Sequence, residues 1–460
     1  MKNKHLSTCF GLEKKYHLGN MHITVRIKKN PLSLSPDTLF SMAERINRKR
    51  GFLFVSHVLG KHIPVYPAIP QLAGASLALL LLETYYQRPQ NLADVFRLGF
   101  THPEKSAGIV HKLENKPFDL PEPMLFIGFA ETATALGHAM FASFANNAYY
   151  IHTTREEVIG LPSCFQFEEQ HSHATTHRCY PQDDALLAKP YPIVLVDDEM
   201  TTGKTSLNLI RSIQQRFPRT TYIVTSLLDW RSEADRAQFA EVEKELGVEI
   251  KTFSLMSGSI HIEGTANPDE TRPKAVSSKV HPIQIKKHYL DEFTTLPSFF
   301  SKNPTPYIEA TGRFGLARDR WEEIKSQIAE TGHRLKQTRR GTRTLCMGTG
   351  EFMYVPFQIA SYMGTGVYVQ STTRSPIQPK KKPHYAIQNG WEFASPDDPE
   401  VRNFMYNIPK NAYDEIYLFL ERDTPLERLT PLYQAIADTG IQWIHQVICS
   451  RRRKERKDFQ

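Results

Sequence analysis

Residues 193–206 read IVLVDDEMTTGKTS, and this stretch is the most informative part of the chain. Its four apolar residues, 193–196, predict a buried parallel strand that ends at two adjacent carboxylates. A short run rich in hydrogen-bond donors follows and leads into an amphipathic segment over 207–217. N–H groups at a helix N-terminus, together with hydroxyls, can hold a phosphate, while carboxylates can bind ribose hydroxyls and Mg²⁺. The pattern predicts a sugar-phosphate site in which the carboxylates are catalytic and hold Mg²⁺ directly or indirectly: Asp197, Asp198, Thr201, Thr202, Gly203, Lys204 and Thr205.

Two other interpretations of this stretch are weaker. A P-loop needs a glycine five positions before Gly203, and Asp198 occupies that position, so this interpretation fails. The remaining alternative is an ordinary strand-to-helix turn with incidental acidic residues.

The composition is that of a globular protein. A length of 460 residues predicts two or three domains, and a hydrophobic content of 40% suits a large core. The formal net charge is +8, to which the six basic and two acidic residues of 451–458 contribute +4. The five cysteines are scattered, without CxxC spacing, and indicate reduced thiols. The apolar run 72–82 is too short to span a bilayer and the N-terminus lacks a signal-peptide pattern, so we expect a soluble cytoplasmic protein with no membrane partner.

Apolar strands alternate with helical patterns along the chain. Strands are predicted at 22–27, 52–55, 125–127, 149–151, 193–196 and 222–227, and a helix that starts at Ser35-Pro36-Asp37 and continues through 39–43. This order predicts an α/β fold with a parallel sheet and ligands at the carboxyl ends of its strands. Prolines among polar residues predict a linker or extended arm at 266–306 between a first domain at 20–265 and a second α/β domain at 307–450, with a basic tail at 451–460.

The second domain repeats a sequence pattern of the first. Residues 125–131 (LFIGFAE) are followed by Thr153-Thr154-Arg155, and 345–351 (LCMGTGE) are followed by Thr372-Thr373-Arg374. The threonine pair begins 22 residues after Glu131 and 21 residues after Glu351. Duplication of a half-domain explains the repeated TTR more readily than convergence on a common strand–turn–helix design.

The stretch 193–206 resembles the PRPP-binding motif of type I phosphoribosyltransferases, where PRPP is 5-phosphoribosyl 1-pyrophosphate. Lys204 departs from the motif, because the family usually has a second glycine there. Residues 125–135 resemble the pyrophosphate loop of the orotate phosphoribosyltransferase-like group, and 56–66 (SHVLGKHIPVY) resemble its hood segment. The resemblance implies a set of pyrophosphate-binding residues: Lys61, Ala130, Glu131, Thr132 and Arg155.

Residues 167–177 (FEEQHSHATTH) lie where this fold class has a loop that closes over the active site. Glu169, His171 and His173 are candidates for proton transfer to or from the acceptor. A metal site that includes His177 and Cys179 and a merely solvated loop are the alternatives. The lysine-rich loop of the orotate enzymes is absent, so an acceptor other than orotate is expected.

Further strings make the resemblance closer, namely TGRFGL at 311–316 and STTRSP at 371–376. With FLFVS, EExHSHAT and the PRPP motif, residues 20–450 resemble a bacterial family that joins a phosphoribosyltransferase to a TRSP domain and is associated with tellurite-resistance and stress gene clusters. The second domain offers a candidate second anion site, or an inactive structural duplicate, at Gly348, Gly350, Glu351, Thr373, Arg374 and Ser375. No second Asp-Asp…Thr-Gly pattern occurs near 413–421, so complete transfer chemistry is not expected there.

The resemblance implies a Mg²⁺-dependent enzyme that moves ribose 5-phosphate from PRPP to a small base-like acceptor, in the synthesis of a nucleoside-like metabolite. A homodimer and partners from the same gene cluster are further expectations. The runner-up is a non-catalytic PRPP-sensing regulator that binds nucleic acid or a protein, and the reverse reaction is a third alternative. The basic tail can touch nucleic acid, but such tails are usually only solvated, so a nucleic-acid partner is not expected.

Overall fold

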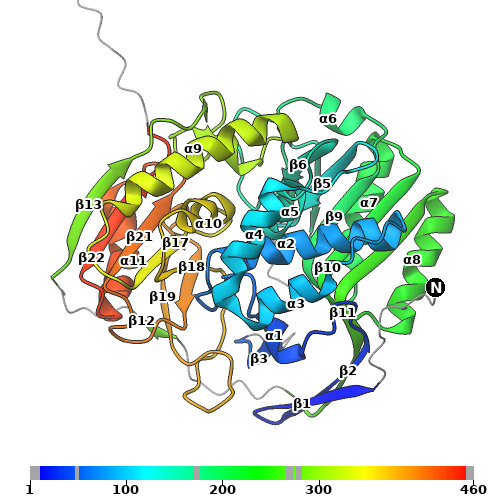
Figure 1. Cartoon of the computed structure of the whole chain (residues 1–460), viewed down its shortest axis with the longest axis horizontal. Helices are drawn as coiled ribbons and strands as arrows, with labels where there is room; N and C mark the ends of the chain where they lie inside the picture. The colour runs from blue at the N-terminus through cyan, green and yellow to red at the C-terminus, as the bar shows by residue number, and fades with distance from the viewer. Residues whose placement is uncertain (1–10, 47–50, 169–175, 266–272, 276–281, 452–460) are drawn as a thin grey trace, which may run out of the picture.

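The computed structural model describes residues 11–46, 51–168, 176–265, 273–275 and 282–451, which form two α/β halves side by side (Figure 1). The first half is built on an eight-stranded sheet and the second on a five-stranded sheet. The first sheet has the order β1 (Leu12–Leu18), β2 (Met21–Lys29), β11 (Glu249–Glu263), β10 (Thr221–Asp229), β9 (Ile193–Met200), β5 (Met124–Gly128), β6 (Ala148–His152) and β16 (Leu316–Ala317). The second has the order β13 (Gln284–Tyr289), β22 (Trp443–Ile448), β21 (Glu415–Leu420), β17 (Thr344–Gly348) and β18 (Val367–Ser371).

Helices cover these sheets and short hairpins extend from them. The first half contains α1 (Pro36–Leu39), α2 (Ala68–Leu80) with a π-helical turn at Leu81–Tyr85, α3 (Ala93–Thr101), a 3₁₀ turn at Pro103–Lys105, α4 (Ser106–Asn115), α5 (Ala133–Ala142), α6 (Ala185–Ala188), α7 (Lys204–Arg216) and α8 (Glu233–Leu246). The second contains a 3₁₀ turn at Glu309–Thr311, α9 (Arg318–Lys336), α10 (Tyr354–Ser361) and α11 (Leu426–Asp438). The small strands are β3 (Phe40–Glu44) with β4 (Phe52–Ser56), β7 (Phe165–Glu168) with β8 (Thr176–Cys179), β14 (Thr295–Leu296) with β15 (Tyr307–Ile308), β19 (Gly390–Ala394) with β20 (Arg402–Tyr406), and β12 (Lys274–Ala275), which pairs with β19.

The strand predictions are confirmed with small changes of boundary, and the α/β architecture with a second α/β domain is confirmed. The predicted helix from Ser35 through residue 43 is wrong beyond its first turn, because α1 ends at Leu39 and β3 begins at Phe40. Phe40 and Met42 are buried on either side of the half-buried Ser41, and β3 pairs antiparallel with β4. This alternation with a paired partner favours a strand over a helix.

The strand order of the first sheet reverses between β5 and β9, which forms a topological switch point. From β5 the chain passes to β6 on one side, returns to β9 on the other, and continues outward to β10 and β11, all in parallel. Strands at such a switch point leave a crevice beyond their carboxyl ends, where α/β proteins bind ligands. This places the ends of β5 and β9, with the residues that follow them, around one crevice.

The second sheet repeats the order of the first. The sequence β11-β10-β9-β5-β6 corresponds position by position to β13-β22-β21-β17-β18, and the strands are parallel in both. The turns agree in detail: the Ala130 N–H donates to Thr153 Oγ1 at 2.9 Å, and the Gly350 N–H donates to Thr372 Oγ1 at 2.9 Å. These matches favour duplication of a half-domain as the origin of the repeated TTR sequence.

Part of the stretch expected to be a linker or extended arm belongs to the second sheet. β13 lies within 266–306 and pairs in parallel with β22 over six residues, Gln284↔Trp443 to Tyr289↔Ile448. It takes the place that β11 has in the first sheet, although it precedes the rest of its half in the chain. Proline content indicated an irregular segment here but could not show that an edge of the second sheet needed a strand.

The two halves exchange segments at the outer edges of their parallel strands. The first hood segment, residues 56–66, leaves its own half, and Val65 pairs with Val369 of β18. The second hood segment, residues 309–317, crosses the other way, and Leu316 in β16 pairs with Tyr150 of β6. Tyr150 and Val369 are each the third residue of their strand, so the exchange is reciprocal.

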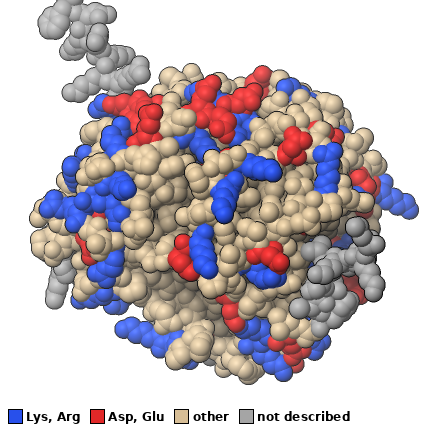
Figure 2. All heavy atoms as spheres, viewed as in Figure 1, with Lys and Arg blue, Asp and Glu red and all other residues tan. Residues whose placement is uncertain are grey.

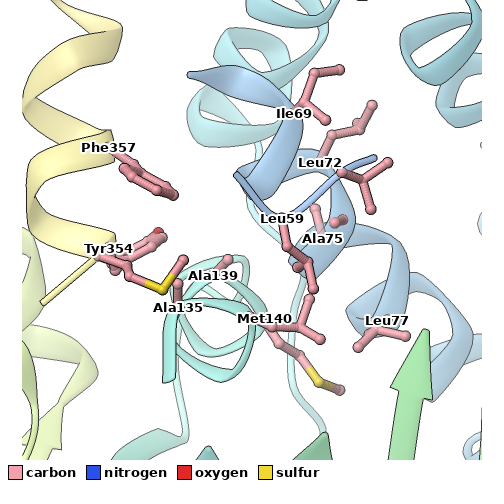
Figure 3. Packing of buried hydrophobic residues seen from close by; sticks show 14 of the residues in the cluster. Leu59, Ile69, Leu72, Ala75, Leu77, Ala135, Ala139, Met140, Tyr354 and Phe357 are labelled. Atoms are coloured by element: carbon pink, nitrogen blue, oxygen red, sulfur yellow. The ribbon is translucent and has the colours of Figure 1, made fainter. Parts of the chain in front are cut away.

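A continuous apolar core joins the halves through three helices. Figure 3 shows α2, α5 and α10 around this core, with Ala75 and Ala139 between α2 and α5 and with Phe357 on α10. These residues belong to one cluster of buried side chains that also contains Val65 and Val369. Among the described residues, one helical stretch, Ala68–Tyr85, is long and apolar enough to cross a membrane, but 83% of it is buried inside the protein.

Candidate functional site

The acidic pair lies on β9 itself rather than after it. The strand continues to Met200, and Asp197, Asp198 and Glu199 are half-buried near its carboxyl end. The Asp198 N–H donates to Asp197 Oδ1 at 2.9 Å, and Thr201 Oγ1 donates to Glu199 Oε1 at 2.6 Å. Carboxylate oxygens are the ligands that Mg²⁺ takes, and Mg²⁺ is commonly held by one or two carboxylates plus phosphates of a substrate. Asp197 and Asp198 therefore fit a Mg²⁺ ion that arrives with a phosphorylated ligand.

The predicted phosphate-binding turn connects β9 to the N-terminus of α7. Thr201, Thr202, Gly203, Lys204 and Thr205 are all half-buried. The turn closes at Gly203, whose φ of 74° is left-handed, and α7 starts at the next residue without a side-chain cap. A helix N-terminus of this kind presents unpaired N–H groups and a partial positive charge to an anion. The structure thus brings together the residues that sequence 193–206 predicted as a sugar-phosphate site.

An arginine that the sequence interpretation missed stands beside this turn. Arg231 follows β10, is buried, and forms an ion pair of 2.9 Å with Asp229. Its guanidinium lies 4.2 Å from the ring centre of Phe239, and a Cβ on Gly203 would approach the same ring to 2.6 Å. The signal was available, because Asp229 and Arg231 end the strand next to β9 at the same edge of the sheet.

The loop that the sequence predicts to bind pyrophosphate follows β5 and is mostly buried. Ala130 and Glu131 are buried and Thr132 is half-buried. Glu131 Oε1 lies 2.6 Å from Lys61 Nζ, and Glu131 Oε2 lies 3.0 Å from Arg155 Nη1. Burial opposes ionisation of Glu131, but the charges of Lys61 and Arg155 outweigh it and hold the pKa of this carboxyl at about 2.

Lys61 occupies a different environment from the one expected of a lysine that faces pyrophosphate. Its side chain is 1% exposed, and Nζ donates to the backbone oxygen of Gly350 in the second half at 2.9 Å. The reason is the crossing of the first hood segment to β18, which carries Lys61 into the contact between the halves. Arg155 keeps 14% of its side chain exposed and remains at the crevice.

The turn after β6 is bound by a carboxylate of the second half. Thr154 Oγ1 donates to Glu351 Oε2 at 2.6 Å, and the Arg155 N–H donates to Glu351 Oε1 at 2.8 Å. The converse contact runs from the Arg374 N–H to Glu131 Oε1 at 3.2 Å. Each TTR turn is therefore held by the glutamate of the opposite half.

The candidate second site gathers around a small cavity at the carboxyl ends of the second sheet. Gly350, Glu351 and Arg374 line it, Gly348 ends β17, and the Ser375 N–H donates to Thr373 Oγ1 at 3.1 Å. Five carboxylates and two arginines stand in its wall: Glu131, Glu156, Glu351, Asp397, Glu421, Arg313 and Arg374.

The five carboxylates of this wall are already paired with basic side chains. Arg313 Nη1 lies 2.8 Å from Glu421 Oε2, and Arg422 Nη2 lies 2.6 Å from Glu156 Oε2. Burial and the charge of Glu156 raise the pKa of Asp397 to about 6. Leu420 and Glu421 stand where the first half has its aspartate pair, so this arrangement favours the inactive duplicate over an anion site.

Three predicted catalytic residues, Glu169, His171 and His173, lie outside the described residues. His177 is buried, its ring lies 5.0 Å from that of Phe167, and Nδ1 lies 3.3 Å from Thr153 Oγ1. Burial and the neighbouring Cys164 raise the pKa of the Cys179 thiol well above its usual value. Within the ranges that the structure describes, no group of three His, Cys, Asp or Glu side chains is placed to hold a metal ion.

Comparison with known proteins identifies both halves. Residues 39–259 match a family described as phosphoribosyl transferase, and residues 310–436 match the TRSP domain found C-terminal to it. No curated protein matches the chain significantly. Similar solved structures include adenine phosphoribosyltransferases from Trypanosoma brucei (16% identity over 34% of this chain and 67% of that chain, TM-score 0.24) and Giardia lamblia (17%, 33% and 80%, 0.21). A hypoxanthine phosphoribosyltransferase from Staphylococcus aureus is also similar (9%, 38% and 70%, 0.20), and at these TM-scores the likenesses carry no argument. On the two family matches, the chain is a phosphoribosyltransferase with a C-terminal TRSP domain.

Proposed function

We propose that the first half transfers ribose 5-phosphate from PRPP to a base-like acceptor and releases pyrophosphate. The observation that carries the proposal is the junction of β9 and α7, where the acidic pair Asp197–Asp198 and the turn 201–205 meet. This junction lies next to the β5–β9 switch point, where a ligand of an α/β sheet is expected.

The geometry of this junction supports the following proposed roles. The turn 201–205 and the N-terminus of α7 bind the 5-phosphate, and Arg231, which is paired with Asp229, packs beside the turn. Asp197 and Asp198 bind the ribose hydroxyls and favour the positive charge that develops on the sugar as the bond to pyrophosphate breaks. Mg²⁺, when bound with PRPP, would neutralise charge on the leaving pyrophosphate.

The leaving group is proposed to lie against the loop 130–132 and Arg155, as in the orotate phosphoribosyltransferase-like group. Thr132 and Arg155 are the more exposed members of this set, whereas Lys61 and Glu131 are buried as an ion pair. We therefore give Arg155 the main role and assign Lys61 to holding Glu131. The role rests on position, since both β5 and β6 end at the crevice.

Proton transfer to or from the acceptor is proposed for Glu169, His171 and His173. Support comes from the second half, where β19 and β20 are joined by 395–401, as β7 and β8 are joined by 169–175. Asp397 lies in the connection 395–401. Its Oδ1 is 3.6 Å from Nη2 of Arg422, which lies just beyond β21. By position, His171 corresponds to Asp397.

The cellular setting belongs to the same proposal: a cytoplasmic enzyme that makes a nucleoside-like metabolite, linked to bacterial tellurite and stress resistance. The described cysteines are free and buried, which suits a reducing compartment. Basic and acidic side chains are interspersed on the face in Figure 2, and this supports a small-molecule substrate over nucleic acid.

The test is the double variant Asp197→Asn/Asp198→Asn. We expect loss of Mg²⁺–PRPP binding in calorimetry and loss of pyrophosphate release with a pool of candidate bases, with little change in the unfolding temperature. Asp183→Asn/Asp184→Asn is the matched control, because it removes another adjacent acidic pair of the same half, next to α6. Undiminished PRPP binding in the first variant would contradict the proposal.

A further inference from the structure

One carboxylate of the second half makes two hydrogen bonds to the first half. Glu351 follows β17 of the second half, and its side chain is 9% exposed. One of its oxygens accepts from Thr154 Oγ1 at 2.6 Å, and the other accepts from the Arg155 N–H at 2.8 Å. The two oxygens thus accept hydrogen bonds from two consecutive residues of the first half.

Arg313 of the second hood segment supports this carboxylate. Its Nη2 lies 3.7 Å from Glu351 Oε2 and its Nη1 lies 2.8 Å from Glu421. Arg313 is 2% exposed, and its guanidinium also stacks on the ring of Tyr307 at 4.5 Å. These contacts hold the Glu351 carboxyl group in one orientation toward Thr154 and Arg155.

The turn that Glu351 holds also sets the pyrophosphate loop. Thr153 Oγ1 accepts from the Ala130 N–H at 2.9 Å, and the Thr153 N–H donates to the Gly128 oxygen at 3.0 Å. Arg155 in turn pairs with Glu131. A shift of the turn 153–155 would therefore move both the loop after β5 and the arginine that we assign to pyrophosphate.

We propose that Glu351 is a positioning residue for phosphoribosyl transfer, so that the TRSP domain completes the pyrophosphate side of the first site. This inference rests on the proposed function. Glu351 does not contact the ligand; it fixes Thr154 and Arg155, which border the crevice. The second half lacks the aspartate pair, but its Glu351 holds the turn 153–155 of the first half.

The experiment compares the affinity of Mg²⁺–PRPP, and separately of Mg²⁺–pyrophosphate, for wild type, Glu351→Gln and Glu351→Asp by calorimetry. A glutamine keeps one acceptor oxygen, but its NH₂ group faces a hydrogen-bond donor of Thr154 or Arg155. We therefore expect both dissociation constants to rise about tenfold or more. Glu351→Asp keeps the charge and should recover part of the affinity. Glu309→Gln is the matched control, because Glu309 pairs with Arg320 within the second half and should leave both affinities unchanged.

A second variant guards against a loss of folding in Glu351→Gln. Thr154→Val removes one donor to Glu351 and the acceptor of the Glu156 N–H at nearly constant volume. It should weaken the binding of both ligands, but less than Glu351→Gln does. Equal affinity in wild type, Glu351→Gln and Thr154→Val would overturn the inference and leave the proposed function standing. Absence of PRPP binding to the wild-type protein would overturn the proposed function and the inference with it.

Discussion

Glu131 links the loop after β5, the first hood segment and the TRSP domain through a single carboxylate. It is ion-paired with Lys61 and Arg155 and accepts from the Arg374 N–H. Its pKa in the folded protein is about 2, against an ordinary value of 4.5. Because the folded pKa is depressed, the carboxylate stabilises the fold fully above about pH 4.5 and loses that contribution as the pH falls toward 2.

Glu131→Gln should therefore destabilise the protein at pH 7 by about 3 kcal/mol, since it leaves Lys61 buried without its partner. The difference from wild type should shrink as the pH is lowered from 7 to 3, because the carboxyl of the unfolded wild-type chain takes up a proton while the folded carboxyl stays largely ionised. Urea unfolding at several pH values measures this, and Glu241→Gln on the exposed face of α8 is the control. A difference that is independent of pH would contradict the assignment of a depressed pKa.

Individual side chains were predicted unevenly from the sequence. The placement of Asp197, Asp198 and the following turn between a strand and a helix could be predicted, because these residues are consecutive in the chain. Lys61 and Arg155 could be assigned to the neighbourhood of the loop after β5, but not to their ion pairs. Their ion pairs are with Glu131 and their hydrogen bonds are with Gly350 and Glu351, and the packing of two distant segments brings these partners together.

At the scale of elements, the N-terminus of α7 leaves little room for a larger residue. Gly203 has a left-handed φ of 74°, and a Cβ there would lie 2.6 Å from the ring of Phe239 and 3.1 Å from Arg231 Cδ. A residue other than glycine would therefore meet both backbone strain and a clash.

Gly203→Ala should lose about 2–4 kcal/mol of stability and weaken Mg²⁺–PRPP binding. Gly247→Ala is the matched control, because Gly247 has a φ of 65° but has nothing within 4 Å of the added methyl group. The control should cost only about 1–2 kcal/mol and leave PRPP affinity unchanged. Chemical unfolding and calorimetry of both variants check this, and equal losses in the two would show that the clash with Phe239 is unimportant.

Element boundaries show where local pattern is sufficient. The apolar run 193–196 located β9, but its continuation to Met200 was not visible, because polar residues at a strand end resemble the start of a turn. The signal at Ser35-Pro36-Asp37 correctly marked a helical turn, and pairing with β4 then made the next residues a strand. Tertiary pairing decided the structure at both points.

The whole molecule is two copies of one sheet arrangement that have exchanged their hood segments. Val65 lies on β18 and Leu316 lies on β6, and one apolar cluster runs through both halves. The repeated glycine, glutamate and TTR predicted the duplication. The exchange could not be predicted, because a duplicated pattern is equally compatible with two separate halves.

A chain that ends at residue 265 should therefore fail to fold on its own, even though it contains nearly all of the first sheet. It lacks β16, and it exposes Val65, Lys61 and Glu131, which are buried in the full chain. We expect insolubility or no cooperative thermal transition for this fragment, and a single transition for the full chain, in calorimetry. A chain that ends at residue 451 is the control and should behave as wild type. A soluble, cooperative fragment would show that the halves are independent.

The crossing of the first hood segment also has a consequence for synthesis on the ribosome. Val65 emerges early, but its partner Val369 is 304 residues further along the chain. At ordinary elongation rates that distance takes about 15–60 s to translate. During this interval the nascent N-terminal segment has no partner strand to cover it, so its solubility depends on a chaperone or on temporary contacts.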